Sequence, residues 1–211
     1  MPPVELKEWI TLIKDGLLCV AALVTTIIAI YGARMWKREL VGKEIYAATR
    51  TLVKESHLLS KATNAARAPI QDYERKVFSD VTVKNTTKKE RWRLSEADAY
   101  KKRIDALSVA YDRYQSALLD VRVLVGSKVY LGFNPFGLLI GGVIHKIANY
   151  IALIQDYSQT IFPDSPEVQA AQGEFYPSDK IDDELSKQIG DAREDGEKCL
   201  LAFLHRTSIR G

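Results

Sequence analysis

The chain has 211 residues, of which 46% are hydrophobic, and a formal net charge of +3 from 30 basic and 27 acidic side chains. Such a balanced charge lacks the strong positive field of a dedicated nucleic-acid-binding protein, so we expect no nucleic-acid partner. Cys19 lies in the most apolar stretch and Cys199 near the other end. We expect no disulfide between them, which agrees with a reducing cytoplasm for the main domain.

The most apolar segment, residues 16–36, predicts a transmembrane helix. No side chain from Gly16 to Ala33 is charged, and at about 1.5 Å per residue the segment matches a hydrocarbon core of about 30 Å. A cleaved signal peptide is the alternative, but its apolar core would be shorter and followed by a cleavage site. Here the run continues directly into Arg34. Residues 1–15 are then a short lead-in on the outer side.

Basic residues around the span predict its orientation. Lys7 and Lys14 precede it, whereas a larger group follows closely: Arg34, Lys37, Arg38 and Lys43. Because Lys and Arg are retained on the cytoplasmic side, the N-terminus is predicted outside and residues 37–211 in the cytoplasm. Trp9 and Trp36 are expected in the two headgroup layers, with Lys37 and Arg38 on the inner one.

Small residues recur every four positions within the span, at Ala21, Thr25, Ala29 and Ala33. Such a stripe allows two helix backbones to approach closely, which would favour self-association into a homo-oligomer. Small residues are also common in spans, so a chance stripe is the alternative.

The rest of the chain predicts four amphipathic helices, at about 37–68, 95–126, 136–161 and 181–206, in an all-α antiparallel bundle. The first carries a three-four seam: Val41, Ile45, Ala48, Leu52, Glu55, Leu59, Ala62 and Ala66. Pro69 should end this helix, Ser95 with Asp98 should cap the second, and Gly126 should end it. Residues 163–180 are interpreted as a linker.

The stretch from 129 to 155 is apolar enough to suggest a second membrane segment, which Asn134-Pro135 interrupts. The uninterrupted part is too short to span about 30 Å, so a buried bundle helix is the preferred interpretation. In an antiparallel bundle, the loop GSKVYLGFNPFG should return to the membrane surface. Tyr130, Phe133 and Phe136 are expected to be exposed there.

Residues 69–94 lack a long helical period and predict an irregular tip or a small hairpin around NTTKKE. If the first bundle helix extends from the membrane, this tip lies on the order of 50 Å away, beyond the reach of lipid charge. A solvated loop is the preferred interpretation of this tip. The alternative is that its basic residues are a candidate site for a cytosolic protein: Lys84, Lys88, Lys89, Arg91 and Arg93.

No motif in the sequence predicts catalysis, a cofactor or a metal site. A di-iron bundle needs Glu three residues before an inward His, but Lys54, Gly142 and Ala202 stand in that position. Phosphate-binding, dinucleotide, zinc and nucleophile-elbow motifs do not occur either. We therefore expect a protein that is not an enzyme and has no cofactor.

The run Trp36-Lys37-Arg38-Glu39-Leu40, followed by Gly42-Lys43 and Tyr46-Ala47, resembles a group of uncharacterised bacterial single-span inner-membrane proteins. They have an N-terminal helix, a Trp-Lys-Arg flank and a cytoplasmic helical hairpin or bundle. The resemblance implies the bacterial inner membrane and no enzymatic activity. The leading hypothesis is a membrane-anchored interaction or scaffold protein with a cytosolic partner. The alternatives are a membrane-active effector of phage exclusion or defence, in which residues 129–155 insert into the bilayer, and a sensor.

Overall fold

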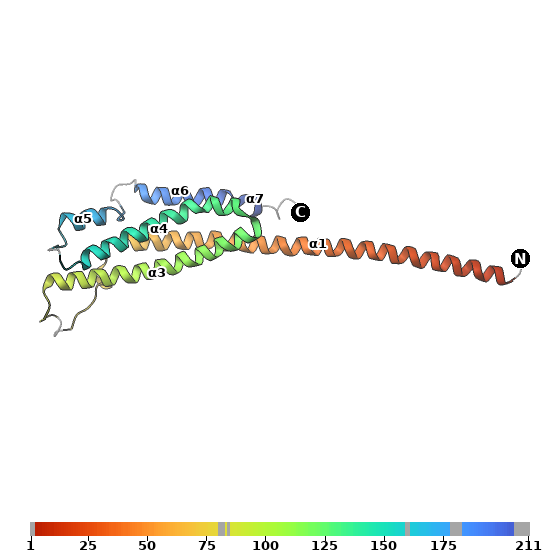
Figure 1. The fold of residues 1–211 in the computed structure, drawn as a ribbon, viewed down its shortest axis with the longest axis horizontal. Helices are drawn as coiled ribbons and strands as arrows, with labels where there is room; N and C mark the ends of the chain where they lie inside the picture. Colours follow the sequence, from red (N-terminus) through yellow and green to blue (C-terminus); the bar gives the residue numbers. More distant parts are fainter. Residues whose placement is uncertain (1–2, 80–82, 84, 159–160, 178–182, 205–211) are drawn as a thin grey trace. The chain divides into compact units, whose positions relative to one another are not determined.

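The structure of the chain, a computed structural model, describes residues 3–79, 83, 85–158, 161–177 and 183–204. The described residues form helices, turns and irregular segments without a strand, so the predicted all-α class is confirmed (Figure 1). The hairpin considered for residues 69–94 is not present among the described residues of that stretch. The chain divides into two compact units, Met1–Glu44 and Ile45–Gly211, and each is treated separately below.

Helix α1, Pro3–Arg67, begins in the first unit and ends in the second. No proline interrupts its interior, and Pro69 follows its last residue closely, as the sequence predicts. In the first unit, every residue from Trp9 to Glu44 is exposed. The hydroxyls of Thr25 and Thr26 donate to the carbonyls of Ala21 and Ala22, both at 2.8 Å. The polar groups of both threonines are therefore satisfied within the helix itself.

The buried seam of α1 in the second unit differs from the predicted one. Leu52, Leu59 and Ala66 are buried as expected, but the positions between them are filled by Thr49, Ser56 and Thr63, each fully buried. Ala48, Glu55 and Ala62 lie one residue earlier and are only half-buried.

These three hydroxyls explain the difference. Thr49, Ser56 and Thr63 donate to the carbonyls of Ile45, Val53 and Leu59, each at 2.8 Å. A hydroxyl that bonds within its own helix brings little unsatisfied polarity into a core. Thr49, Ser56 and Thr63 can therefore face the core in place of the residues one position earlier, which the sequence pattern favoured.

Helix α3, Lys88–Val125, begins earlier than predicted. Its N-cap is Thr87, whose hydroxyl accepts from the Glu90 amide at 3.2 Å while the Glu90 carboxylate accepts from the Thr87 amide at 2.7 Å. This reciprocal pair is a full capping box, so Thr87 and Glu90 cap the helix and the cap predicted at Ser95 and Asp98 is wrong. Ser95 instead lies buried inside the helix. At the other end, Gly126 ends α3 as predicted, with φ of 101°, a backbone conformation that favours glycine.

Helix α4, Ser127–Gln155, follows immediately and includes the segment predicted as a loop. Pro135 lies inside it, where its missing N–H leaves the Leu131 carbonyl without its helical donor. Burial of Val129, Phe133 and Phe136 against the other helices offsets this loss. The helix also ends at Gln155, earlier than the predicted Ile161.

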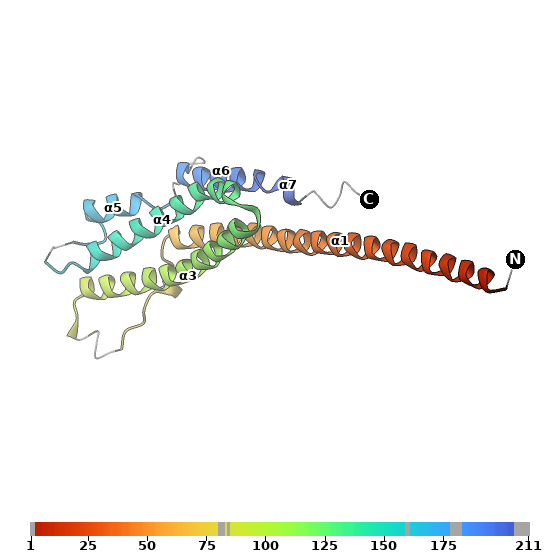
Figure 2. The ribbon, with the colours of Figure 1, turned by 45° about the vertical axis from the view of Figure 1, so that its right-hand side comes forward.

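Three further helices complete the second unit: α5, Pro166–Gly173; α6, Glu184–Lys198; and α7, Leu201–Leu204. Helix α5 lies in the predicted linker, where Val168 and the following Phe175 are fully buried. The predicted last helix is interrupted between α6 and α7, and parts of its range, 181–182 and 205–206, lie outside the described residues. Helix α4 packs against α3, α5 and α6 and forms the centre of this unit (Figure 2).

Two glycines bring α4 and α6 close together. A Cβ atom added to Gly196 would lie 2.8 Å from the Phe133 ring, and one added to Gly132 would lie 2.8 Å from the Cys199 sulfur. Neither glycine could gain a side chain without displacing its neighbour. The α4–α6 contact is therefore built around the absence of these two side chains.

Candidate partner-binding site at the α1–α3 connection

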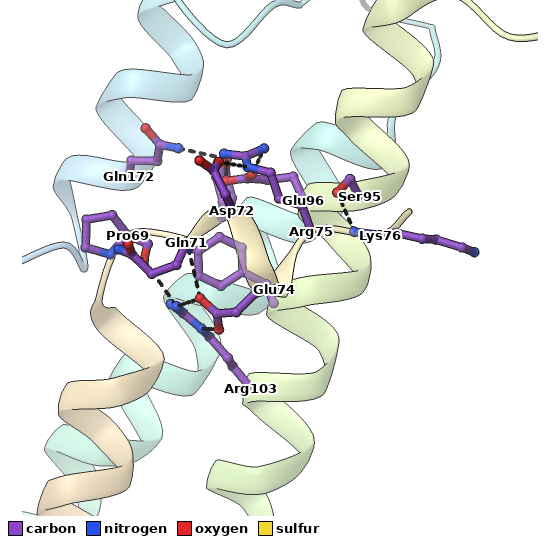
Figure 3. A network of polar contacts seen from close by, with 12 residues as sticks. Pro69, Gln71, Asp72, Glu74, Arg75, Lys76, Ser95, Glu96, Arg103 and Gln172 are labelled. Carbon is purple, nitrogen blue, oxygen red and sulfur yellow. Dashed lines mark hydrogen bonds and ion pairs between the residues drawn. The ribbon is translucent and has the colours of Figure 1, made fainter. Parts of the chain in front are cut away.

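The connection between α1 and α3, residues 68–87, contains the short 3-10 helix η1, Asp72–Glu74. The Arg103 side chain of α3 binds the first residues of the connection (Figure 3). The guanidinium donates to the carbonyls of Ala68 and Pro69 and to both carboxylate oxygens of Glu74, at 2.8 and 2.5 Å. Hydrogen bonding to Arg103 holds the pKa of Glu74 below its ordinary value. One side chain thus fixes the point at which the chain leaves α1.

A second set of contacts holds the middle of the connection against α3 and α4. Arg75 lies 3.4 Å from the Glu96 carboxylate, which also accepts from the Tyr150 hydroxyl at 3.3 Å. The Gln172 side chain donates to Tyr150 at 2.9 Å. Burial raises the pKa of Glu96, although the charge of Arg75 opposes the shift. The ion pair between Arg75 and Glu96 thus joins an irregular part of the connection to the core of the bundle.

Next to them, the Lys76 amide donates to the Ser95 hydroxyl at 3.0 Å (Figure 3). Ser95 therefore does not cap a helix, as the sequence predicted, but binds the backbone of the connection.

Below the connection, a fully buried arginine ties the end of α1 to the C-terminal helices. Arg67 donates to the Phe175 carbonyl at 2.7 Å, to the Ser186 hydroxyl at 2.6 Å and to Asp183 at 2.6 Å. Burial alone would raise the pKa of Asp183, but hydrogen bonds from Ser186 and Arg67 outweigh it and lower the pKa. The C-terminal end of α1, from which the connection starts, is thus held by charge-assisted hydrogen bonds of the buried Arg67.

The connection presents two apolar side chains to solvent. Tyr73 is 87% exposed and Val77 is 93% exposed, although the residues between them are tied to α3. Lys76, also between them, has an exposed side chain. A fixed backbone that exposes an aromatic and an aliphatic side chain can bind another protein with little loss of conformational entropy.

The predicted basic site is mostly used inside the molecule. Lys84 lies outside the described residues, and Lys88 is exposed. Lys89 lies 4.7 Å from the centre of the Phe162 ring. Arg91 donates to the carbonyls of Val83 and Thr86 at 3.0 and 2.6 Å.

Arg93 is buried, donates to the Asp156 carbonyl at 3.1 Å and lies over the Tyr157 ring. The expectation that Arg93 is available on the surface is therefore wrong, because its position on α3 faces the end of α4. Tyr73 and Val77 were missed by the sequence analysis. Their one signal was an apolar residue on each side of a strongly polar run with no helical period.

The residues predicted at the membrane interface have different environments. Trp9, Trp36, Lys37 and Arg38 are exposed in the first unit. In the second unit, Tyr130 is half-buried beneath the Arg122 guanidinium, 4.8 Å from the ring centre.

Phe133 and Phe136 are fully buried, so their predicted exposure is wrong. The reason is that the expected loop is helical, which turns both rings toward Tyr114 of α3 and brings Phe133 against Gly196 of α6. The stripe of small residues in α1 is exposed, at Ala21, Thr25, Ala29 and Ala33.

Within the described residues, no group of three or more His, Cys, Asp or Glu side chains could hold a metal ion. Comparisons with protein-family models, curated proteins and solved structures gave no significant match to the chain. Helix α1 and helix α4 are both long and apolar enough to cross a membrane.

Proposed function

We propose that the protein is a membrane-anchored, non-enzymatic interaction or scaffold protein. Residues 16–36 cross the bacterial inner membrane with the N-terminus outside, and the bundle presents the α1–α3 connection to a cytosolic protein. The observation that carries the proposal is the complete exposure of residues 9–44, including the uncharged run, in the same helix that supplies the bundle seam.

The size of the exposed apolar surface supports a lipid environment. Eight aliphatic side chains of the predicted span are at least half exposed: Leu17, Leu18, Val20, Leu23, Val24, Ile27, Ile28 and Ile30. At about 1.5 kcal/mol or more for each, leaving them in water costs on the order of 10 kcal/mol, as much as the whole stability of many domains. Hydrocarbon removes that cost and leaves the rest of the helix unchanged.

Membrane fractionation with matched variants tests the anchor. The Leu23→Arg/Ile28→Arg variant places two charges near the middle of the span, at about 2.5–3.5 kcal/mol each. It should lose resistance to carbonate extraction. The control, Val109→Arg/Leu138→Arg, changes two similarly exposed residues of the second unit and should stay in the membrane fraction. Wild-type protein that is extracted by carbonate would contradict the anchor.

Photo-crosslinking in membranes tests the partner site. A photoreactive residue at Tyr73 should give a defined crosslinked product, and the product should disappear when Val77 and Lys76 are changed to Ser. The same probe at Val109 serves as control, since that side chain is about half exposed and lies outside the connection. Equal crosslinking patterns from both positions would contradict a partner site at the connection.

A membrane-active effector remains the second candidate, because α4 is long and apolar enough to cross a membrane, although 39% of its most apolar part is buried. Insertion would require α4 to leave α6. A Cβ at position 132 would lie 3.5 Å from Cys199 Cβ, close to the separation found in disulfides. Gly132→Cys can therefore lock α4 to α6.

The lock gives a direct test of insertion. If α4 inserts, induced expression of wild type should lower the membrane potential. Because the cytoplasm is expected to be reducing, cells that express Gly132→Cys are treated with a thiol oxidant to close the lock; the potential should then stay unchanged, and a reductant should restore the effect. Gly142→Cys, with nothing within 4 Å of the added Cβ, is the control that cannot lock. An unchanged potential with wild type under all conditions would exclude this candidate.

A further inference from the structure

The turn between α3 and α4 exposes apolar side chains that the bundle does not use. Val123 in the last turn of α3 is 84% exposed, and Leu131 in the first turns of α4 is 63% exposed. Both lie within five residues of Gly126, where the chain reverses. We define the turn surface as Arg122, Val123, Lys128 and Leu131.

The charge of this surface has one sign. Arg122 and Lys128 are exposed, and the acids closest to them in the sequence are the exposed Asp120, one helical turn before Val123, and Asp156. Arg122 also covers the Tyr130 ring, which keeps its guanidinium at the turn. In the last turns of α6, Glu194 and Asp195 are paired with Lys198, at 3.3 and 2.8 Å. Glu197 is paired with His57 and Arg193, at 3.1 and 3.3 Å.

The turn lies at the end of the second unit where α1 enters it. Arg103 binds the carbonyl of Ala68, just after the end of α1, and α3 runs back from there alongside α1 (Figures 1 and 2). The stretches Ile45–Arg67 and Arg103–Val125 have equal lengths, so α3 is long enough to return toward the level of Ile45.

The chain itself limits how far this end can be from the bilayer. From Trp36, the predicted end of the span, to Ile45 there are nine residue steps. These reach at most about 30 Å even when fully extended. The turn surface is therefore tethered within reach of the membrane on the side where the basic flank Lys37-Arg38 is expected.

We infer that the turn surface docks on an anionic lipid bilayer, with Val123 and Leu131 entering the headgroup boundary and Arg122 and Lys128 binding lipid phosphates. The inference rests on the proposed membrane anchor and replaces Phe133 with the residues that the structure exposes. An apolar pair flanked by cations is the pattern of interfacial binding. Cations near an anionic surface are attracted to it, so the pair would hold this end of the bundle at the membrane.

The test uses the full chain in vesicles, with Cys19→Ser and Cys199→Ala and an environment-sensitive fluorophore on one new cysteine. Val123→Cys and Leu131→Cys are the probe sites, and Val109→Cys, on the middle of α3, is the control. In vesicles of phosphatidylglycerol and phosphatidylcholine, the two probe sites should give blue-shifted emission and protection from an aqueous quencher. The control site should give neither.

The Arg122→Gln/Lys128→Gln variant should lose the shift yet still float with the vesicles, because the span is untouched. Flotation without any shift in the parent protein would overturn the inference and leave the anchor intact, whereas loss of flotation would overturn the anchor itself. A shift that persists in pure phosphatidylcholine and falls on dilution of the protein in the membrane would identify a second copy as the occupant, and would also overturn the inference.

Discussion

The α4–α6 contact gives a sharp prediction through two glycines on one helix. Gly196→Ala and Gly190→Ala make the same chemical change in α6. A Cβ at Gly190 has nothing within 4 Å, whereas one at Gly196 would lie 2.8 Å from two atoms of the Phe133 ring and 3.0 Å from a third. Normal carbon contacts are about 3.5–4.0 Å. Phe133 is fully buried, so its ring cannot move aside into solvent.

The magnitudes follow from two opposing terms. Replacing a helical Gly by Ala gains about 0.8–1 kcal/mol in helix propensity. Inserting a methyl group into a packed contact costs typically 1–3 kcal/mol. Gly190→Ala should therefore be stabilising by up to about 1 kcal/mol, and Gly196→Ala should be less stable than Gly190→Ala by about 1–3 kcal/mol. At about 2–4 °C per kcal/mol for a protein of this size, the two melting temperatures should differ by roughly 2–12 °C.

The assay is thermal unfolding in mild detergent, followed by near-UV circular dichroism, which reports the packing of aromatic side chains. Adding Phe133→Leu to Gly196→Ala should recover part of the loss, because a smaller side chain gives the new methyl group room. Gly196→Ala that melts at or above Gly190→Ala would refute the close contact between α4 and α6.

Three further predictions concern the buried charges and use the same melts. Arg103→Met should destabilise the second unit by about 2 kcal/mol, because several charge-assisted bonds are lost and two carbonyls lose a donor; a change within about 0.5 kcal/mol would show that Arg103 does not hold the connection. Glu74→Gln and Glu96→Gln should have opposite pH dependences. The pKa of Glu74 is lowered in the folded state, so its ionised form stabilises the fold at pH values above the ordinary pKa of 4.5. This contribution to stability is lost as the pH falls through the lowered pKa. Burial raises the pKa of Glu96, so the folded state favours the protonated form of this carboxyl group. Its contribution to stability is fully present at pH values below the ordinary pKa of 4.5 and is lost as the pH rises through the raised pKa. Glu74→Gln should thus be destabilising at pH 7, and Glu96→Gln neutral or stabilising there; the same sign for both at pH 7 would contradict these environments. Finally, Arg93→Gln should cost about 1–3 kcal/mol, whereas Lys88→Gln should change stability by less than about 0.5 kcal/mol, and equal effects would contradict the burial of Arg93.

The part of α1 in the second unit cannot slip by one residue without moving Thr49, Ser56 and Thr63 out of the core.

Several predictions from sequence rested on local signals and were confirmed. Pro69 ends α1 and Gly126 ends α3, because a missing donor and a left-handed backbone are local requirements. The uncharged run at residues 16–33 is likewise legible without any tertiary information. Apolar periodicity was enough to predict the all-α class.

The errors in helix limits arose where long-range contacts outweigh local preference. Pro135 is a local signal for a loop, but the burial of Phe133 and Phe136 keeps α4 helical around it. The segment predicted as a linker holds α5, because Phe175 and Val168 have a core to enter.

The sequence alone predicted the helical class and the ends of α1 and α3 near Pro69 and Gly126, since these depend on residues within a few positions of one another. Tertiary structure decided which face of each helix is buried, that Arg93 and Phe133 are inside, and that Tyr73 and Val77 are displayed. These outcomes depend on which distant side chains meet, such as Arg103 with Glu74 and Gly196 with Phe133. Periodicity along one helix carries no information about such pairs, because they form between helices far apart in the chain.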